Sequence, residues 1–383
     1  MNLNNEKVEK KIKILFLAKY LDPGGVTVHM FELGRELMKR GFCVGIACGK
    51  ETCEHNYTLD RFRKAGFYTY EIEFPGRDFN IIKAIFAFTK LIRVVLEYKP
   101  NIIHTHWRAT SIYAEIISHI FKVPYVSSIH SDKIPAGPLY RLLSFWGEYA
   151  IAISKETYDY LHIAFKLPKS RIRLVHNGID VEYFRPPSDE ERNRARSKFG
   201  ISQGKKVVCI IAKLTKNKGH DILFKAISLL KKKGINPIVI CAGAGDKDMI
   251  YNWAQESDVL ENIILPGFID SRDVLWASDI LALPSRVEGF PLVVIKAMAC
   301  GVVPIRTSTA GAYDQIDDGI NGFIISCEDY KTLADKIELL LTKQELRNEM
   351  SIQARKKTQE VFSLETMLDK IEEIYKDVLS QGS

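Results

Sequence analysis

Short apolar runs alternate along most of the chain with longer segments whose apolar residues recur at helical spacing. In the first half, the predicted strands are 11–20, 42–49, 101–107, 124–130, 150–154 and 172–178. The predicted helices between them are 26–41, 80–98, 109–121, 137–148 and 155–166. Short buried strands that alternate with helices indicate a parallel sheet with helices on both faces.

The alternation stops at residues 185–206, a polar segment with Pro-Pro near its start, and then begins again. The second set of predicted strands is 206–214, 236–243, 262–267, 279–285 and 302–307, with helices predicted at 219–232, 246–256, 271–276 and 291–299. We therefore expect an α/β fold of two Rossmann-like, doubly wound parallel-sheet domains, residues 1–185 and 186–362. A last helix at 363–383 is expected to pack back on the first domain. Ligands bind such sheets beyond the carboxyl ends of the strands, so we expect the site in a cleft between the domains.

The bulk composition, 46% hydrophobic and 26% charged over 383 residues, is that of a soluble globular protein. The polar N-terminal segment has no apolar region behind it, which predicts no signal peptide. Lysines and an arginine interrupt the longest apolar stretch, 81–98, and argue against a membrane span. Seven cysteines without a CxxC pair predict a reducing compartment and no zinc site, with Cys209, Cys241 and Cys300 in the core.

Positive charge is concentrated in the first half of the chain. Residues 1–185 hold 27 Lys and Arg against 19 Asp and Glu, a net +8, whereas the remaining residues hold 27 against 28, a net −1. This asymmetry favours an anionic surface or substrate, and a lysine-rich solvated surface is the plainer alternative. Basic motifs with aromatic spacing and finger or helix-turn-helix signatures are absent from the sequence, so we expect no nucleic-acid partner.

Two loops carry groups that suit phosphate oxygens. Gly24 and Gly25 follow the first strand, where glycines let backbone N–H groups approach an anion at a helix start; a plain turn is the alternative. Lys213 and Lys218 surround the end of the strand at 206–214 and suit a diphosphate, although lysines are usually solvated. The glycine loop is not GxGxxG and no acid stands out as a ribose clamp, so we expect no dinucleotide cofactor.

The residues give no strong signal for a metal ion. Asp246 and Asp248 form a DxD pattern, but acids at this place more often open a helix, where carboxylates suit the dipole. Four histidines lie near predicted strand ends, where a site role and a structural role both stay open: His104, His106, His130 and His176. Spacing alone supports no Ser-His-Asp arrangement.

The stretch from 284 to 301 has the most chemical content. A strand end is followed by a loop with Glu288, then by Pro291 at a first helical turn and Gly301 at the helix end. Four backbone amides accompany the carboxylate at this helix start: Gly289, Phe290, Leu292 and Val293. The amides can hold a phosphate while Glu288 accepts hydrogen bonds from hydroxyls. A surface acid before a short buried helix is the other interpretation.

The order and spacing of several segments together resemble the retaining glycosyltransferases of family 4, with the GT-B fold of two facing Rossmann-like domains. The matching segments run nearly end to end: PGGVTVH, NIIHTHW, SSIHSD, VHNGIDVEYFRP, AKLTKNKGHDIL, LPGFID, ASDILALPSRVEGFPLVVIKAMACGVVPI and TAGAYDQIDDGINGFII. The resemblance implies that the second domain binds a nucleotide-activated sugar and that the first binds the acceptor.

Individual residues match the family's site positions. Gly24 and Gly25 match a glycine loop beside the diphosphate and acceptor, and His130 matches a histidine near the donor sugar. The resemblance also places Lys218 on the diphosphate, and Phe268 and Ile269 along the base.

Two positions depart from the family pattern. Lys213 stands where an Arg is usual, which keeps the charge but loses the fork geometry. Glu288 matches the first acid of an acid-x7-acid motif that contacts the donor sugar, but Lys296 replaces the second acid, which usually binds both ribose hydroxyls. An ammonium only donates hydrogen bonds, whereas a carboxylate accepts them. Lys296 therefore either donates to ribose or phosphate oxygens, points away, or marks a poor or inactive transferase.

The resemblance predicts a metal-independent, retaining hexosyltransferase that uses a UDP-sugar, with a GDP-sugar as second choice. His130, Lys213, Lys218 and Glu288 are the expected catalytic groups, with no cofactor beyond the donor substrate. The acceptor is expected to be a glycan or lipid-linked precursor of a bacterial cell-surface polysaccharide. Two rival functions stay open: a non-catalytic glycan-binding or partner subunit, favoured by Lys296, and a sugar-nucleotide epimerase of the same architecture.

We expect a cytoplasmic location, and the basic first domain would allow peripheral contact with the inner membrane face. The helix at 81–98 is the element considered for that contact, although its apolar character favours packing in the core.

Overall fold

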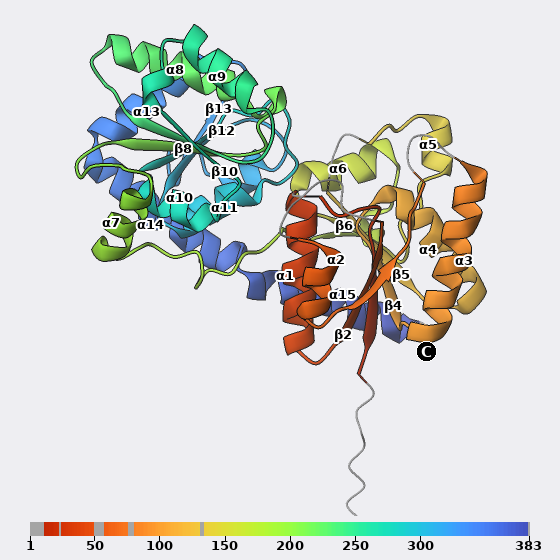
Figure 1. The fold of residues 1–383 in the computed structure, drawn as a ribbon. Coiled ribbons are helices and arrows are strands. Elements are labelled where there is room, and N and C mark those ends of the chain that lie inside the picture. Colours follow the sequence, from red (N-terminus) through yellow and green to blue (C-terminus); the bar gives the residue numbers. More distant parts are fainter. Residues whose placement is uncertain (1–10, 23, 50–56, 76–79, 131–133, 382–383) are drawn as a thin grey trace, which may run out of the picture. The chain divides into compact units, whose positions relative to one another are not determined.

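The computed structural model describes residues 11–22, 24–49, 57–75, 80–130 and 134–381 and contains two compact units (Figure 1). The first unit comprises Met1–Ile153, Thr157–Val175 and Leu368–Ser383, and the second comprises Ser154–Glu156 and His176–Met367. The main division thus falls at 175/176, ten residues before the boundary expected from the sequence. Residues 1–10, on which the signal-peptide expectation rests, Pro23 of the glycine loop and Cys53 lie outside the described residues.

The first unit contains a seven-stranded parallel sheet in the order β3-β2-β1-β4-β5-β6-β7. Its strands are β1 (Lys13–Leu17), β2 (Cys43–Cys48), β3 (Tyr68–Glu71), β4 (Ile102–Thr105), β5 (Tyr125–Ile129), β6 (Tyr149–Ala152) and β7 (Ile172–Leu174). Its helices are α1 (Gly25–Lys39), α2 (Leu59–Lys64), α3 (Ile81–Tyr98), α4 (Arg108–Phe121), α5 (Pro138–Leu142), α6 (Lys155–Ala164) and the 3-10 turn η1 (Lys169–Arg171). Strand order reverses at β1, which pairs with both β2 and β4.

The second unit contains a six-stranded parallel sheet in the order β10-β9-β8-β11-β12-β13. Its strands are β8 (Val207–Ile211), β9 (Ile238–Ala242), β10 (Ile263–Gly267), β11 (Ile280–Leu283), β12 (Val303–Thr307) and β13 (Phe323–Ile325). Its helices are α7 (Asp189–Lys198), α8 (His220–Lys232), α9 (Lys247–Glu256), α10 (Ser271–Ala277), α11 (Leu292–Ala299), α12 (Ala312–Gln315), α13 (Tyr330–Thr342) and α14 (Gln344–Val361), with 3-10 turns η2 (Lys216–Lys218) and η3 (Leu260–Asn262). Order reverses between β8 and β11.

These two sheets confirm the predicted fold class of two doubly wound parallel-sheet halves. The three cysteines expected in the core are buried, Cys209 and Cys241 completely and Cys300 to 3% exposure. Asp246 caps α9 by accepting a 2.9 Å hydrogen bond from the Met249 amide, which confirms its helix-opening role. None of the described helices is long and apolar enough to cross a membrane.

Several elements do not show a simple apolar period, and the sequence did not predict them. β3 is an edge strand without a buried residue, and β13 has only three residues. The segment 137–148, expected to be one helix, forms only the short α5. The polar segment at 185–206, interpreted as a linker, contains α7.

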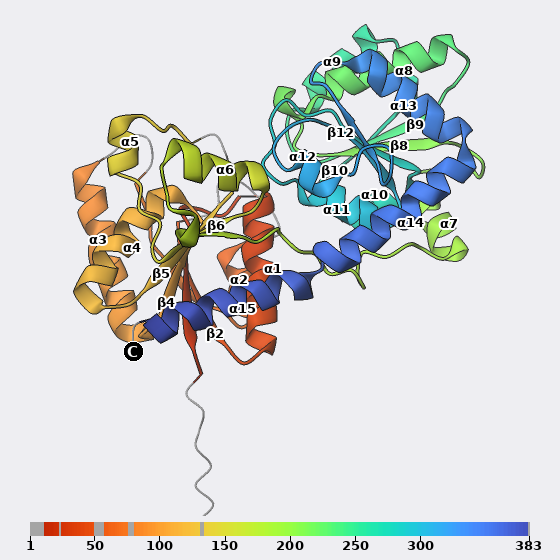
Figure 2. The same cartoon turned by 180° about the vertical axis from the view of Figure 1, so that it is seen from behind.

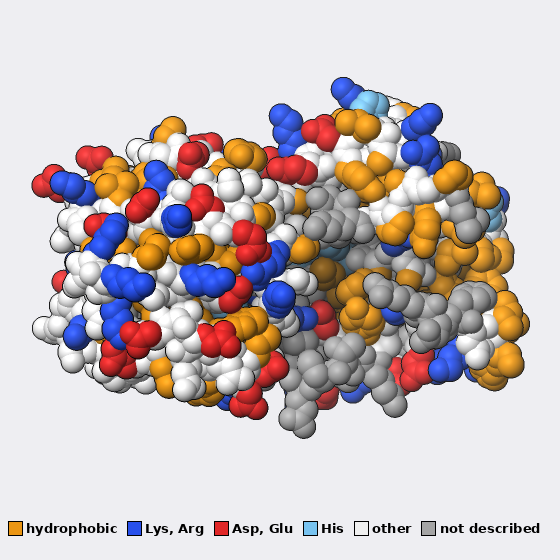
Figure 3. All heavy atoms as spheres, turned by 90° about the horizontal axis from the view of Figure 1, so that it is seen from above, with side chains coloured by type: hydrophobic (Ala, Val, Ile, Leu, Met, Phe, Trp, Pro, Cys, Tyr) orange, Lys and Arg blue, Asp and Glu red, His pale blue; other side chains and the backbone are white. Residues whose placement is uncertain are grey.

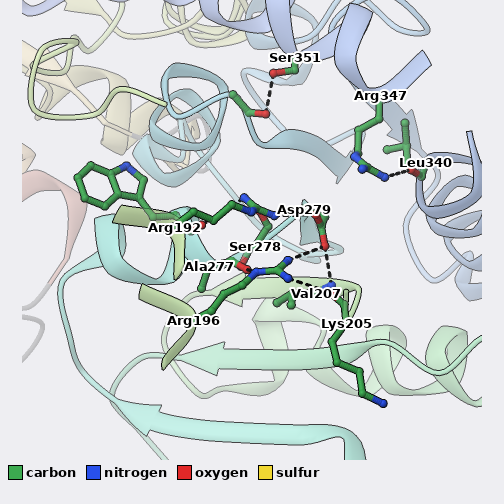
Figure 4. A network of polar contacts seen from close by, with 12 residues as sticks. Arg192, Arg196, Lys205, Val207, Ala277, Ser278, Asp279, Leu340, Arg347 and Ser351 are labelled. Carbon is green, nitrogen blue, oxygen red and sulfur yellow. Dashed lines mark hydrogen bonds and ion pairs between the residues drawn. The ribbon is translucent and has the colours of Figure 1, made fainter. Parts of the chain in front are cut away.

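Ion pairs, rather than an apolar stripe, hold α7 on the second unit (Figure 4). Its start is a capping box in which Ser188 and Glu191 satisfy each other's backbone amides. Arg192 and Arg196 then reach Asp279, at 2.7 Å and 3.3 Å. Because this helix has little apolar surface, hydrophobic periodicity alone does not predict it.

The last helix, α15 (Leu364–Gln381), returns from the second unit to the first, where it runs beside α1 and β4 (Figure 2). Tyr375 is completely buried and its hydroxyl lies 2.7 Å from Nδ1 of His104 at β4. At the helix start, Arg40 contacts Asp369 at 2.6 Å and Glu372 at 3.1 Å. The C-terminal segment is therefore part of the first unit's core.

Candidate active site

In the second unit, the residues expected to bind the donor follow neighbouring strands at the point where strand order reverses. Lys213 and Lys218 follow β8, and Glu288 follows β11, which is hydrogen-bonded to β8. Ligands of doubly wound sheets bind beyond the carboxyl ends of the strands at such a reversal. The topology therefore brings the two loops with the most chemical content to one edge of one sheet.

Lys218 and Glu288 form an ion pair at this edge. The Nζ of Lys218 lies 2.7 Å from Oε1 of Glu288, and the two side chains are 23% and 8% exposed. A nearly buried carboxylate needs a charged partner, because removing it from water is costly unless its charge is paired. The residues expected to hold a diphosphate and a sugar are thus partners of each other.

A second ion pair fixes the loop that carries Glu288. Arg286 makes two hydrogen bonds to the carboxylate of Asp221 on α8, at 2.9 Å and 2.8 Å. The Arg286 amide donates to the carbonyl of Asn217 at 2.8 Å. The pKa of Arg286 is raised, chiefly by its hydrogen bond to Asp221. These contacts of Arg286 therefore fix the loop after β11 against the loop that carries Lys218.

Gly219, the residue after Lys218, lets the backbone of its loop lie directly against the end of β11. Gly219 has a φ of 73°, and a Cβ placed on it would lie 2.1 Å from the carbonyl oxygen of Pro284, at the end of β11. No side chain can be accommodated at that distance, and the left-handed backbone conformation already favours glycine. The contact between Gly219 and Pro284 fixes the position of the Lys218 backbone against β11.

The start of α11 offers backbone donors beside Glu288. Its N-cap is Pro291, which has no side-chain acceptor, and the first amides of a helix have no intrahelical partner. Leu292 and Val293 are the first two residues of α11, and Gly289 and Phe290 lie in the loop before it. Phe290 is buried and stacks on His176, with ring centroids 5.4 Å apart. Phe290 therefore anchors this loop by packing rather than by facing solvent.

Arg306 is a charged residue of this region that the sequence analysis did not single out. It lies on β12, is fully buried, and donates hydrogen bonds to Thr309 Oγ1 at 2.8 Å and to the Ala310 carbonyl at 2.9 Å. Burial lowers the pKa of Arg306 to about 10, and the nearby charge of Glu288 opposes that change. In the sequence, the sign of this residue was an arginine inside an apolar predicted strand, because buried arginines are rare unless they are paired.

The structure places the Lys296 ammonium over an aromatic ring. Lys296 lies on α11, and its Nζ is 4.7 Å from the ring centroid of Phe184, which is 8% exposed. A cation over a ring face is attracted by the ring quadrupole. The Lys296 ammonium thus has an aromatic partner within the protein.

The other expected donor residues lie in the loops after β8 and β10. Lys213 lies in the loop after β8 and is exposed. Phe268 and Ile269 follow β10, two strands away from β8 in the sheet, and Phe268 is 45% exposed. An exposed aromatic ring at a strand's carboxyl end is suited to stack on a flat ligand.

In the first unit, the glycine loop contacts a carboxylate of the chain itself, that of Asp22. Gly24 is the N-cap of α1 and Gly25 its first residue. The Gly24 amide donates to Oδ1 of Asp22 at 3.2 Å, and a Cβ at Gly24 would lie 2.8 Å from that oxygen. The glycine thus allows a close approach to a carboxylate of the chain itself, and an external anion here would compete with Asp22.

Histidines gather where the order of the first sheet reverses. His104 and His106 come from the end of β4, His130 from the end of β5, and His29 from α1. Burial lowers the pKa of His29 to about 4 and of His104 to about 3, and it holds the pKa values of His106 and His130 well below the usual range. Burial thus favours the neutral form of each of the four rings.

A polar hollow in the second unit lies at the opposite edge of the sheet, around the amino ends of β8, β11 and β12. Arg192, Arg196 and Arg347 line it (Figure 4). Arg192 and Arg196 are engaged with Asp279, and Arg347 donates to the Leu340 carbonyl at 2.6 Å. These donors hold helices in place, so the hollow is not our candidate for the active site.

Two sequence families match the chain, one on each half. The model for "Glycosyl transferases group 1" matches residues 191–357, and the model for "Glycosyltransferase Family 4" matches residues 23–183. Together they span both units described above.

Individual relatives are distant but cover the chain almost completely. An uncharacterized glycosyltransferase of Methanocaldococcus jannaschii is 23% identical over an alignment of 374 positions that covers 92% of this chain and 94% of that protein. The Escherichia coli UDP-Gal:alpha-D-GlcNAc-diphosphoundecaprenol alpha-1,3-galactosyltransferase is 24% identical over 370 residues, with 92% and 93% coverage. The structure of HepE from Anabaena in complex with UDP-glucose matches with a TM-score of 0.82 at 18% identity, covering 96% of this chain and all of that one. The fold is therefore GT-B.

Proposed function

The chain belongs to glycosyltransferase family 4, with a group 1 domain in its second half, and from that premise we propose that it transfers a hexosyl group from a nucleoside diphosphate sugar to an acceptor hydroxyl. We propose a UDP-sugar as donor, with a GDP-sugar as the second choice, and retention at the anomeric carbon. A UDP-sugar is supported by the E. coli relative, whose name specifies UDP-Gal, and by HepE, which was solved with UDP-glucose.

The observation that carries this proposal is the Lys218–Glu288 ion pair at the reversal of the second sheet. A diphosphate that enters beside α11 competes with Glu288 for the ammonium of Lys218. Glu288 is then free to accept hydrogen bonds from sugar hydroxyls, which carry no charge. One pair of side chains thereby keeps a nearly buried acid paired before the donor binds and supplies two donor contacts afterwards.

The bond changes define what the site must stabilise. The bond between the anomeric carbon and the diphosphate oxygen breaks, and the diphosphate leaves with the electron pair. The acceptor oxygen bonds to the anomeric carbon, and its proton passes to the leaving diphosphate. Lys213, Lys218 and the first amides of α11 would stabilise the negative charge that develops on the diphosphate. We propose that this step uses no metal cofactor, and that His130 lies beside the donor sugar.

Lys296 changes how the ribose is held. In the family pattern an acid at this position accepts from both ribose hydroxyls, whereas here the ammonium lies over Phe184. We propose that other acceptors of the second unit hold the ribose, at some loss of donor affinity. One charged hydrogen bond is worth about 1.5–3 kcal/mol.

The acceptor that we propose is a lipid-linked glycan precursor, which would place the first unit at a membrane surface. The second half of α3 packs into the core through Leu91, Val94 and Val95, as the sequence favoured. Its first turns instead expose four large apolar residues at 56–65%: Ile81, Ile82, Ile85 and Phe86. Figure 3 shows hydrophobic side chains over this part of the first unit, on the right of the view.

An exposed apolar face with neighbouring basic residues suits the headgroup region of an anionic membrane. Lys83 and Lys90 line a shallow pocket with Phe86 on the same helix. The support is thus a combination of apolar exposure and positive charge on one element.

Release of nucleoside diphosphate from a panel of UDP- and GDP-sugars, with and without lipid-linked acceptors, tests the proposed transfer. Donor-dependent release with a matched acceptor supports it. Donor binding without release under every condition would select the rival function of a non-catalytic partner subunit, which Lys296 alone favours. Neither binding nor release with any donor would reject the proposed transfer.

A further inference from the structure

The polar hollow at the amino ends of the second sheet has more basic than acidic groups in its wall. Its volume is about 360 Å³, within the range of small-molecule sites, but its lining is mainly polar. Five lysines and arginines line it against a single acid, Asp279. A concave surface lined by one sign of charge attracts ligands of the opposite sign. The hollow is therefore suited to a small polar ligand that carries negative charge.

The single acid of this wall is already neutralised. Oδ1 of Asp279 accepts a hydrogen bond from Arg192 at 2.7 Å, and Oδ2 accepts one from Arg196 at 3.3 Å. Oδ2 also accepts a hydrogen bond from the Val207 amide at 2.8 Å. Two guanidinium groups thus share one carboxylate. Among the described residues, neither arginine has a second acidic partner, so one positive charge of the pair is left without a counter-charge.

Arg347 brings a further positive charge to the hollow from α14 (Figure 4). A guanidinium group has five N–H donors in a planar fork. The Arg347 side chain donates to the Leu340 carbonyl at 2.6 Å, and it has no other hydrogen-bond partner and no acid among the described residues. Most of its N–H groups are therefore available to a ligand, in the arrangement that matches the oxygens of a phosphate.

The three guanidinium groups are close enough to influence one another. The pKa of Arg196 is lowered, chiefly by burial. The charges of Arg192 and Arg347 lower this pKa further, whereas the charge of Asp279 raises it. Like charges gathered in one place disfavour each other until an anion joins them. The wall therefore has an excess of positive charge that Asp279 does not balance.

The start of α14 brings further donors to the same hollow. Gln344 and Asn348 line it together with Arg347, all within the first two turns of this 18-residue helix. The N-cap, Lys343, makes no side-chain capping hydrogen bond. The first backbone amides therefore keep the partial positive charge of a helix start, which favours an anion. A helix start combined with an arginine fork is a favourable place for a phosphate group.

We propose that this hollow binds a phosphate group, either as inorganic phosphate or as the monoester of a small metabolite. Arg347, Gln344 and Asn348 would donate hydrogen bonds to its oxygens, and the phosphate charge would balance the excess from the arginines of α7. The ligand would join α7 to α14 and so stabilise the second unit. Because the hollow lies at the edge opposite the Lys218–Glu288 pair, this site is separate from the proposed donor site.

The test measures thermal unfolding of the full chain with sodium phosphate, and separately with a hexose 6-phosphate, against sodium chloride at equal ionic strength. We expect saturable stabilisation by phosphate, as for any ligand that binds only the folded state. Arg347→Met should raise the apparent Kd more than about tenfold, because it removes charge-assisted hydrogen bonds. Lys356→Met, which removes an exposed charge elsewhere on α14, is the matched control and should bind as wild type. The compound with the lower Kd identifies the source of the phosphate.

Two further variants locate the bound anion. Lys218→Met removes the expected diphosphate contact of the candidate active site, and it should keep the stabilisation by phosphate. Gln344→Glu replaces an amide with a carboxylate of the same shape. An acid suits the start of a helix, so this variant should fold, but its charge repels phosphate and should weaken binding. Gln344→Glu therefore decides the question if Arg347→Met fails to fold.

Three results contradict the proposal. In the first, phosphate stabilises the wild-type chain no more than chloride does. In the second, the stabilisation disappears in Lys218→Met, which places the anion at the candidate active site. In the third, Gln344→Glu binds phosphate as tightly as wild type, or Lys356→Met loses as much affinity as Arg347→Met. These readouts measure anion binding and not sugar transfer, so their failure leaves the proposed function standing.

Discussion

Lys218 and Glu288 are 70 positions apart in the sequence, yet their charged atoms meet at 2.7 Å where the second sheet reverses its strand order. The pair joins the loop after β8 to the loop after β11. Its acid is nearly buried and its lysine is partly accessible, so an incoming anion can reach the lysine first. This relationship is the structural basis for the predictions on donor binding.

Replacing Lys218 should remove the main contact to the departing diphosphate. We predict that Lys218→Met lowers kcat/KM for sugar transfer by about 100- to 1000-fold, the usual cost of losing a preorganised charge stabiliser. The matched control is Lys216→Met, which removes an exposed lysine from the same 3-10 turn. Steady-state kinetics on both variants checks the prediction, and equal losses in the two would contradict it.

Restoring an acid at position 296 should improve donor binding. Lys296→Glu gives up the contact with Phe184 but supplies a carboxylate acceptor for ribose hydroxyls, and we predict about tenfold tighter UDP-sugar binding. Lys296→Met removes the charge without adding an acceptor and should show no such gain. Calorimetric titration of both variants decides, and weaker donor binding by Lys296→Glu would show that the lysine itself contacts the donor.

Gly219 should be intolerant of a side chain. Gly219→Ala places a Cβ 2.1 Å from the Pro284 carbonyl oxygen, and we predict a loss about 2–3 kcal/mol larger than in Gly234→Ala. Gly234 is a close control because its φ is 78° and a Cβ added there would meet nothing within 4 Å. Urea unfolding of the two variants compares the free energies. Equal losses would mean that backbone strain, and not the contact with Pro284, sets the cost.

The hydrogen bond between Tyr375 and His104 should stabilise the first unit. Tyr375→Phe leaves Nδ1 of a fully buried histidine without its 2.7 Å partner, and we predict a loss of about 1–3 kcal/mol. Tyr313→Phe, at a residue that is 66% exposed, is the control and should change stability by less than about 0.5 kcal/mol. Chemical denaturation measures both. An unchanged free energy for Tyr375→Phe would show that water replaces the hydroxyl.

Glu191 gives the second unit a defined pH dependence. The side-chain hydrogen bond from Arg185 is the main reason that the pKa of Glu191 falls from its ordinary 4.5 to about 2. A folded-state pKa below the unfolded value means that the contribution is complete above pH 4.5 and is lost as the pH falls toward 2. We predict that Glu191→Gln unfolds with a shallower pH dependence in this window, whereas Glu190→Gln on the same turn follows wild type. Urea unfolding at a series of pH values measures both slopes, and a Glu191→Gln slope equal to that of wild type would contradict the prediction.

Much of the fold followed from apolar periodicity, because buried parallel strands such as β1 and β8 are short continuous apolar runs. α7 was not predicted because charged rather than apolar side chains hold it in place. β3 was not predicted because it is an edge strand without a buried residue. Glu288 and Lys218 were singled out from the residues themselves and received their expected roles from the family resemblance, but their mutual contact required the three-dimensional structure. His106 and His130 were singled out from the sequence as histidines at strand ends, whereas their proximity to His29 on α1 required the folded structure.

The most direct test of the proposed function is nucleoside diphosphate release from UDP- and GDP-sugars by the wild-type chain and by Lys218→Met, in the presence of lipid-linked acceptors. We predict acceptor-dependent release of UDP from at least one donor by the wild type, reduced at least about 100-fold in the variant. Release that is the same in both proteins would contradict the assigned role of the Lys218–Glu288 pair. No donor binding and no release by the wild type would contradict the proposed transferase function itself.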